Sequence, residues 1–150
     1  MLRRSPLPQG AKKRKRRIVV DTNVLVAGIS GFREQYIPDK NPSADLLHKW
    51  AETDNFVWLV TEDILDEYKE VLKRLGVRSN HIGAVINLIR ERAEDVEVRD
   101  SFEISPDPKD DVFCLCAEKG KADFIITLNP KDFPQVFLKA KVVSPSKFFT

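Results

Sequence analysis

The stretch IVVDTN at residues 18–23 decides the fold, because a short β-branched run stops there at an aspartate. Ile and Val favour strands, and a run without alternating polar residues is typical of a parallel sheet covered on both faces. A second stretch, FIITLN at residues 124–129, has the same form. Active groups of open parallel sheets gather beyond the carboxyl ends of strands, so both stretches mark candidate sites.

The chain between and beyond these two stretches alternates helix and strand patterns. Capping residues and apolar periodicity predict helices and strands in turn. This alternation predicts an α/β fold with a parallel sheet, formed by residues 18–150 as one domain. The further elements are a helix from Ser43, a strand over Phe56–Val60, a helix capped by Thr61 and ending at Gly76, a helix from Ser79, a weaker strand over Val96–Val98, a helix from Pro108 or Lys109 to Gly120, a short helix over Pro130–Leu138 broken by Pro134, and a last strand at Val142–Val143.

Composition excludes several classes of protein. The 150 residues suit one domain, and no apolar run approaches the roughly 18 residues of a membrane span. The two cysteines, Cys114 and Cys116, are two apart in a predicted helix, so we expect them to be buried and unpaired. The two histidines, His48 and His81, fall in different predicted helices, which argues against zinc. We therefore expect a cytoplasmic protein without a membrane anchor.

The charge is unevenly distributed along the chain. Residues 1–17 hold eight of the 25 basic residues and no acid, which leaves 17 basic against 23 acidic residues, or −6, in the remainder. Such a tail is either a nucleic-acid contact or a disordered, solubilising extension, and the sequence leaves both readings open. The residues predicted to bind RNA are Lys12, Lys13, Arg14, Lys15, Arg16 and Arg17.

Three acids are candidates for a catalytic cluster. Asp21 ends the first strand, although an aspartate there also serves as a helix cap. Glu67 lies on the shoulder of the apolar stripe of its helix and is the acid of that helix best placed to point inward, unless it pairs with Lys73 or Arg74 across the surface. Asp110 can face the cleft at the start of the helix beyond Pro108, whereas we expect Asp111 only to cap that helix.

Carboxylates gathered in one cleft repel one another and persist mainly when a cation neutralises them. Oxygen ligands alone favour Mg²⁺ or Mn²⁺ over zinc. Such a cation can activate a water molecule and stabilise the charge that develops on a phosphodiester. The three acids therefore predict metal-dependent phosphodiester hydrolysis.

Four motifs in order resemble the PIN-domain family over residues 17–150, close to its branch of toxins from toxin–antitoxin pairs. They are VDTNVLV at 20–26, ILDEY at 64–68, DPKDD at 107–111 and ITLNPKDFP at 126–134. The resemblance implies a three-layer α/β/α sandwich around a central parallel sheet. It also implies a Mg²⁺- or Mn²⁺-dependent endoribonuclease that cuts single-stranded RNA, often as a homodimer held by an antitoxin protein.

The resemblance also assigns roles to individual residues. The family's catalytic, metal-binding acids fall on Asp21, Glu67 and Asp110, and the polar residues that orient them fall on Asn23 and Thr127. At the fourth acidic position this chain has Asn129, which can offer a carbonyl oxygen but no charge. Asp132, three residues later, is the candidate for the missing metal-binding carboxylate.

Competing interpretations fit the sequence less well. A haloacid-dehalogenase-like phosphatase needs an acid two residues after Asp21, where this chain has Asn23. A P-loop or dinucleotide fold needs a glycine-rich turn after the first strand, and residues 21–26 contain no glycine. The alternative that stays open is a catalytically weak PIN fold that binds RNA or a protein without cutting.

Overall fold

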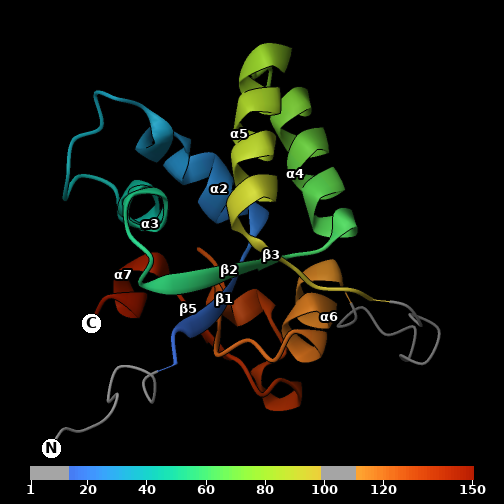
Figure 1. The fold of residues 1–150 in the computed structure, drawn as a ribbon. Coiled ribbons are helices and arrows are strands. Elements are labelled where there is room, and N and C mark those ends of the chain that lie inside the picture. Colours follow the sequence, from blue (N-terminus) through green and yellow to red (C-terminus); the bar gives the residue numbers. More distant parts are fainter. Residues whose placement is uncertain (1–13, 99–110) are drawn as a thin grey trace, which may run out of the picture.

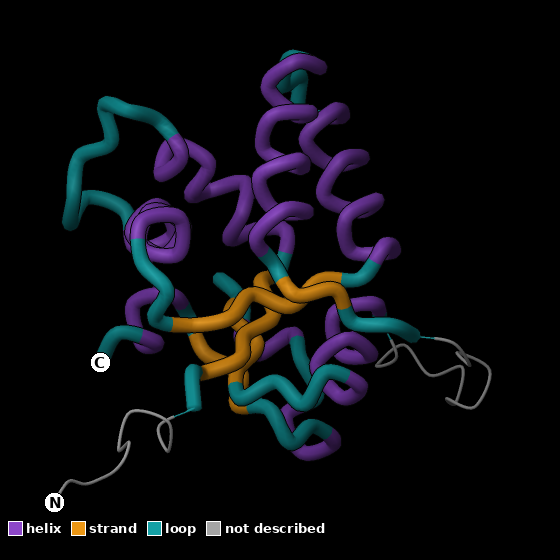
Figure 2. Tube along the Cα trace, viewed as in Figure 1, coloured by secondary structure: helices purple, strands orange, loops and turns teal. Residues whose placement is uncertain are grey.

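The computed structural model describes residues 14–98 and 111–150 of the chain. Within these ranges five strands form one sheet in the order β3-β2-β1-β4-β5, and all paired neighbours are parallel. Figure 2 shows the strands as a central layer with helices on both sides. The strands are β1 (Arg16–Val20), β2 (Phe56–Val60), β3 (Glu94–Asp95), β4 (Phe124–Ile126) and β5 (Lys141–Val143).

Helices cover both faces of this sheet (Figure 1). Helices α2, α3, α4 and α5 lie on one side, with α4 and α5 packed side by side, and α6 lies on the other against β1, β2 and β4. The predicted α/β fold with a central parallel sheet is therefore confirmed. The helices are α2 (Thr22–Gly28), α3 (Pro42–Glu52), α4 (Glu62–Arg74), α5 (Ser79–Arg92), α6 (Val112–Lys119) and α7 (Pro145–Phe148), with 3-10 turns η2 (Ile29–Phe32), η4 (Pro130–Asp132) and η5 (Gln135–Phe137).

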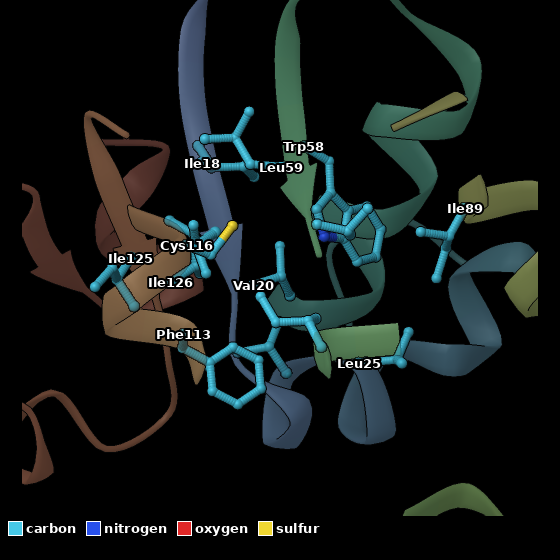
Figure 3. Close-up of a cluster of buried hydrophobic side chains, with 14 of the residues drawn as sticks. Ile18, Val20, Leu25, Trp58, Leu59, Ile89, Phe113, Cys116, Ile125 and Ile126 are labelled. Atoms are coloured by element: carbon cyan, nitrogen blue, oxygen red, sulfur yellow. The ribbon is translucent and has the colours of Figure 1, made fainter. Parts of the chain in front are cut away.

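The core lies on both faces of the central strands (Figure 3). Ile18, Val19 and Val20 are completely buried, as a run without polar alternation predicts. On β2, Trp58 packs edge-on against Trp50 of α3, with ring centroids 4.7 Å apart, and against Tyr68 of α4 at 6.2 Å. The β-branched run is buried because helices cover the sheet on each side.

Several element boundaries agree with the sequence prediction. The strand over Phe56–Val60 forms as predicted, and α5 begins at Ser79. The Thr61 hydroxyl accepts a hydrogen bond from the Ile64 N–H and so caps α4. Gly76 follows that helix with a φ of +85°, a left-handed conformation in which glycine avoids the steric cost of a side chain.

Other boundaries differ from the prediction. The predicted strand over Val96–Val98 is wrong, because β3 occupies Glu94–Asp95 and Val96 only adds one backbone bond to Val60. The helix expected from Ser43 begins at Pro42, because the side-chain Oδ1 of Asn41 accepts from the N–H groups of Ser43 and Ala44. Proline fits this first helical position because it has no N–H to satisfy there.

The remaining differences concern elements elsewhere along the chain. β1 begins at Arg16, two residues earlier than predicted, and α2 and α7 were not predicted. The helix expected from Pro108 or Lys109 begins at Val112, while residues 99–110 lie outside the described ranges. The predicted broken helix over Pro130–Leu138 forms two separate 3-10 turns, because Pro134 interrupts it.

Helix α7 closes the amino end of the sheet, opposite the end where Asp21 lies. Phe148 packs edge-on against Phe56 and Phe124, the first residues of β2 and β4, with centroids 5.4 and 5.3 Å apart. The Arg16 guanidinium lies 4.0 Å from the centre of the Phe148 ring. The C-terminal residues therefore contact three strands at the amino end of the sheet, away from the candidate site.

Two expectations about residue chemistry can be compared with the structure. Cys114 and Cys116 are both buried and form no disulfide, as predicted. Burial raises the pKa of the Cys116 thiol to about 12. Within the described parts of the chain, no helix has both the length and the hydrophobicity needed to cross a membrane.

Candidate active site at the carboxyl end of the sheet

The two polar strand ends meet because β1 and β4 are neighbours in the sheet. Val20 pairs with Ile126, and the Asp21 N–H donates to the Ile126 carbonyl at 2.9 Å. Asp21 and Thr127 each lie one residue beyond the end of their strand, and the Thr127 hydroxyl donates to Oδ2 of Asp21 at 2.7 Å. A residue from each half of the chain thus contributes to one hydrogen-bonded pair.

Thr127 is the centre of a wider network. Its side chain is completely buried, and its Oγ1 accepts from the Asn129 N–H at 3.1 Å and from Asn23 Nδ2 at 3.4 Å. Asn23 Oδ1 in turn accepts from the Leu128 N–H at 3.2 Å. The contacts fix the loop after β4 against the first turn of α2, so Asp21 and Asn129 occupy set positions at one edge.

Thr22 connects Asp21 to Glu67. Its N–H donates to Oδ1 of Asp21 at 2.8 Å, and its hydroxyl donates to Oε2 of Glu67 at 3.3 Å. Glu67 is exposed to solvent on α4, so its carboxylate is accessible at the edge where Asp21 lies. The pairing with Lys73 or Arg74 that the sequence allowed for Glu67 does not occur.

Tyr68 holds α4 against the carboxyl end of β1. Its buried hydroxyl donates to the Val20 carbonyl at 2.5 Å and accepts from Trp58 Nε1 at 3.4 Å. Because Tyr68 follows Glu67 directly, this contact fixes the turn of helix that presents the glutamate. Sequence analysis missed Thr22 and Tyr68 as site residues. Their positions beside Asp21 and Glu67 were the signal available for finding them.

Burial and neighbouring negative charges disfavour ionisation of Asp21. Burial of the carboxyl is the main cause that raises its pKa, and the charges of Asp111 and Asp132 raise it further. The hydrogen bonds from Thr127 and from the Thr22 N–H act in the opposite direction, but the net pKa remains above its usual value. A cation beside Asp21 would offset both the cost of burying its negative charge and the repulsion from Asp111 and Asp132.

The other predicted acids have different surroundings. Asp111 caps α6 by accepting from the N–H groups of Phe113 and Cys114, which confirms its expected capping role. Asp132 is exposed in η4, and its N–H donates to the Asn129 carbonyl. Asp110, the third predicted metal ligand, lies outside the described residues.

The described residues alone do not complete a metal centre. Among residues 14–98 and 111–150, no three His, Cys, Asp or Glu side chains lie close enough together to hold a metal ion. The possible ligands at the carboxyl end of the sheet are nevertheless carboxylate, hydroxyl and amide oxygens, which suit Mg²⁺ or Mn²⁺ and not a metal that prefers thiolate ligands. Asp21 lies near the negative charges of Asp111 and Asp132, which a divalent cation at this edge would help to neutralise.

The end of the basic segment is tied to the domain. Arg14 pairs with Asp123, Lys15 with Asp54 and Arg17 with Glu94, at 2.6, 2.5 and 2.6 Å. Three of the six residues predicted to bind RNA therefore have carboxylate partners within the fold. Lys12 and Lys13 lie outside the described residues, and Arg16 stacks on Phe148.

A cavity of about 640 Å³ lies away from the acidic edge. Its lining comes from the loop before α3, from α3 itself and from the C-terminal residues, and includes Tyr36, Asp45, His48 and Phe149. It contains none of the residues in the Asp21 network. The candidate site is therefore assigned from its chemistry and hydrogen bonding, not from the depth of a pocket.

Comparison with known proteins adds one finding. The family description "PIN domain" matches residues 17–131, which include Asp21, Glu67, Asp110 and Asn129. A search of curated proteins gave no match.

Proposed function

The chain belongs to the PIN-domain family, a family of metal-dependent nucleases, and from this premise we propose that it is an endoribonuclease that cuts single-stranded RNA. The observation that carries the proposal is the network that joins Asp21, Thr22, Glu67 and Thr127 at the carboxyl end of the sheet. It draws residues from three separate parts of the chain into one edge rich in oxygen donors.

The proposed metal ligands are Asp21, Glu67 and Asp110, with Asp132 as a further carboxylate. When bound, Mg²⁺ or Mn²⁺ would activate a water molecule and neutralise charge on the scissile phosphodiester. The chain's own residues prepare this position. Thr127 and the Thr22 N–H orient the two oxygens of Asp21, and Tyr68 keeps α4 in place so that Glu67 faces the same edge.

Cleavage of a mixed RNA in Mn²⁺ tests the proposal. Because substitution of residues that merely support a metal ligand typically costs about 10- to 100-fold, Asp21→Asn, Glu67→Gln and Asp110→Asn should each slow cleavage by roughly 100-fold or more. Glu70→Gln, on the same helix as Glu67, is the matched control and should keep full activity. Full activity in Asp110→Asn would remove that residue from the site, and an inactive wild type would overturn the proposal.

A second candidate function is RNA or protein binding without cleavage, and Asn129 is the observation that favours it. Asn129 is exposed beside Thr127 and brings no charge to the fourth acidic position. If this neutrality limits metal binding, Asn129→Asp should strengthen Mn²⁺ binding and speed cleavage. If Asp132 supplies the missing charge, Asp132→Ala should instead slow cleavage while Asn129→Asp changes little.

We extend the proposal to a toxin of a toxin–antitoxin pair, active in the cytoplasm as a homodimer and held by an antitoxin protein. The support is the set of four motifs that resemble the toxin branch of the family. Co-expression with the product of an adjacent small reading frame tests this part. A stable complex that suppresses RNA cleavage is expected, and a nuclease that is harmless to its host without any such partner would contradict it.

A further inference from the structure

We propose that a basic surface running from η4 to the amino end of β1 binds phosphates of the RNA strand at a distance from the scissile bond. This inference rests on the proposed function, because it assumes that RNA is the substrate cut at Asp21. We call this surface the lysine track. It consists of Lys131, Lys139 and Lys141 on the segment around η4, η5 and β5, with Arg14 and Arg16 at the start of β1.

The charge of the track differs from that of the domain. Residues 127–141 contain three lysines and one aspartate, and all three lysines are exposed, whereas residues 18–150 as a whole carry −6. Lys139 and Lys141 have no carboxylate within ion-pair distance in the described parts of the chain. Their positive charges are therefore available for phosphates, which an otherwise acidic domain would repel.

The far end of the track is a shallow hollow of about 480 Å³. The residues that line it lie at or just before the first residues of β1, β4 and β5, which are adjacent in the sheet. They are Arg14, Arg16, Asp123, Phe124, Lys139 and Lys141. The one acid among them, Asp123, already pairs with Arg14 at 2.6 Å. The hollow therefore has a net positive charge, which favours an anionic group.

Exposed apolar side chains lie between the lysines along the chain. Val136 is 88% exposed and Phe137 is 64% exposed, both on η5. Basic residues interleaved with exposed aromatic side chains are typical of single-strand binding. The composition of the segment thus suits RNA better than it suits a purely ionic partner.

The outer edge of β5 is closed to another protein strand. Gln135 Oε1 accepts from the Val142 N–H at 2.8 Å, and Gln135 Nε2 donates to the Ala140 carbonyl at 2.8 Å. These are the backbone groups that an added strand would need. The same two bonds fix η5 against β5, so Lys139 and Lys141 stay beside the hollow. A nucleic acid needs charge and stacking and not a free strand edge, so the closed edge of β5 does not oppose its binding.

Strand geometry gives the length of RNA involved. Asp21 follows Arg16 by five residues, and a strand rises about 3.3 Å per residue, so the hollow lies about 17 Å from the acidic edge. A stacked nucleic-acid strand advances about 3.4 Å per nucleotide, so about five nucleotides separate the two positions. Only an RNA longer than this can reach both.

The test measures RNA binding without cleavage. The probe is a fluorescein-labelled, unstructured RNA of roughly 20 nucleotides, several times the length of the track, in EDTA with wild type and Lys139→Gln/Lys141→Gln. Each phosphate contact on a single strand contributes about 0.7 to the salt dependence of affinity, so the variant's slope should be shallower by up to about 1.4. Lys139→Glu/Lys141→Glu should weaken binding further. Lys40→Gln/Lys73→Gln, with the same charge change on exposed lysines elsewhere, is the control.

A cleavage assay in Mn²⁺ separates this inference from the proposed function. Lys139→Gln/Lys141→Gln should raise KM for the long RNA and leave kcat unchanged. With an RNA of about four nucleotides, too short to span the track, it should match wild type. An affinity and salt slope equal to those of the control pair would overturn the track even if cleavage is normal. A shallower slope with no cleavage by wild type would support RNA binding at the track and refute the nuclease.

Discussion

At the scale of single residues, one hydroxyl group organises the candidate site. Thr127 Oγ1 donates to Asp21 and accepts from both Asn23 and the Asn129 N–H, so its removal would leave several polar groups without a partner. The carboxyl group of Asp21 has hydrogen-bond partners but an unfavourable electrostatic environment. It has hydrogen bonds to both oxygens, yet its pKa is still raised above the usual value because burial and two nearby carboxylates outweigh these bonds.

This environment predicts how Asp21 affects stability with pH. Its pKa in the folded protein is raised, so its contribution to stability is complete below the unfolded value and is lost as the pH rises through the folded value. At about pH 7 in EDTA, Asp21→Asn should therefore melt at the same or a higher temperature than wild type, and the difference should close toward about pH 4. Asparagine keeps an oxygen that can accept from the Thr22 N–H.

The effect of Mn²⁺ on the melting temperature is a second test of the role of Asp21. If Mn²⁺ binds the folded protein at Asp21, as proposed, it should raise the melting temperature of wild type more than that of Asp21→Asn. Thermal unfolding with Mn²⁺ and with EDTA checks both effects in one series. A variant clearly less stable than wild type in EDTA at neutral pH would show that the Asp21 charge acts mainly as the cap of α2.

At the scale of helices and strands, the acids divide into those that cap and those that face the site. Asp111 accepts from two N–H groups in the first turn of α6, and Thr61 caps α4 six residues before Glu67. Glu67 itself makes no cap and instead reaches Thr22. The caps stabilise the first turns of α4 and α6, and other acids on or beside these helices remain available for the candidate site.

The two neighbouring acids at the start of α6 should therefore respond differently to substitution. Asp111→Ala should destabilise the protein by about 1 kcal/mol through loss of the cap, or roughly 2–4 °C in melting temperature for a chain of this size. Asp111→Asn should restore most of this loss because it keeps an acceptor. Asp110→Ala should leave the melting temperature in EDTA unchanged and remove the stabilisation by Mn²⁺. The reverse pattern would exchange the two roles.

At the scale of the whole molecule, the sheet separates two kinds of chemistry. The carboxyl end carries the Asp21 network, and the amino end carries the Phe148 contacts and the basic hollow. The basic N-terminal segment enters the domain at the amino end. Its last residues pair with Asp123, Asp54 and Glu94, so part of its charge already stabilises the fold.

Deletion of residues 1–13 tests what the remaining tail charge does. This change removes four basic residues, Arg3, Arg4, Lys12 and Lys13, and keeps the three ion pairs and all of β1. If all four contact phosphates, the salt slope for RNA binding should become shallower by about 2 to 3. The melting temperature and Mn²⁺ affinity should not change. Equal affinity and an equal slope in the truncated protein would leave the tail as a solvated extension.

The sequence by itself determined the α/β fold class and several of its elements, and it predicted the chemistry of the site. Periodicity, caps and β-branched runs act over a few residues, so Phe56–Val60, the Thr61 cap and the burial of Ile18 to Val20 could be predicted. The misplaced β3 shows the limit of this reasoning, because Val96 is buried by its contact with the sheet and not by a strand of its own.

Only the tertiary structure decided which of these groups meet. The order β3-β2-β1-β4-β5 makes β1 and β4 neighbours, and that pairing alone brings Thr127 to Asp21 across 106 residues of sequence. Likewise, the packing of Tyr68 under Val20 brings Glu67 to Thr22, and the meeting of β1, β4 and β5 gathers Arg16 with Lys141. Hydrogen bonds between distant strands set these contacts, and no local pattern of residues encodes which strands will pair.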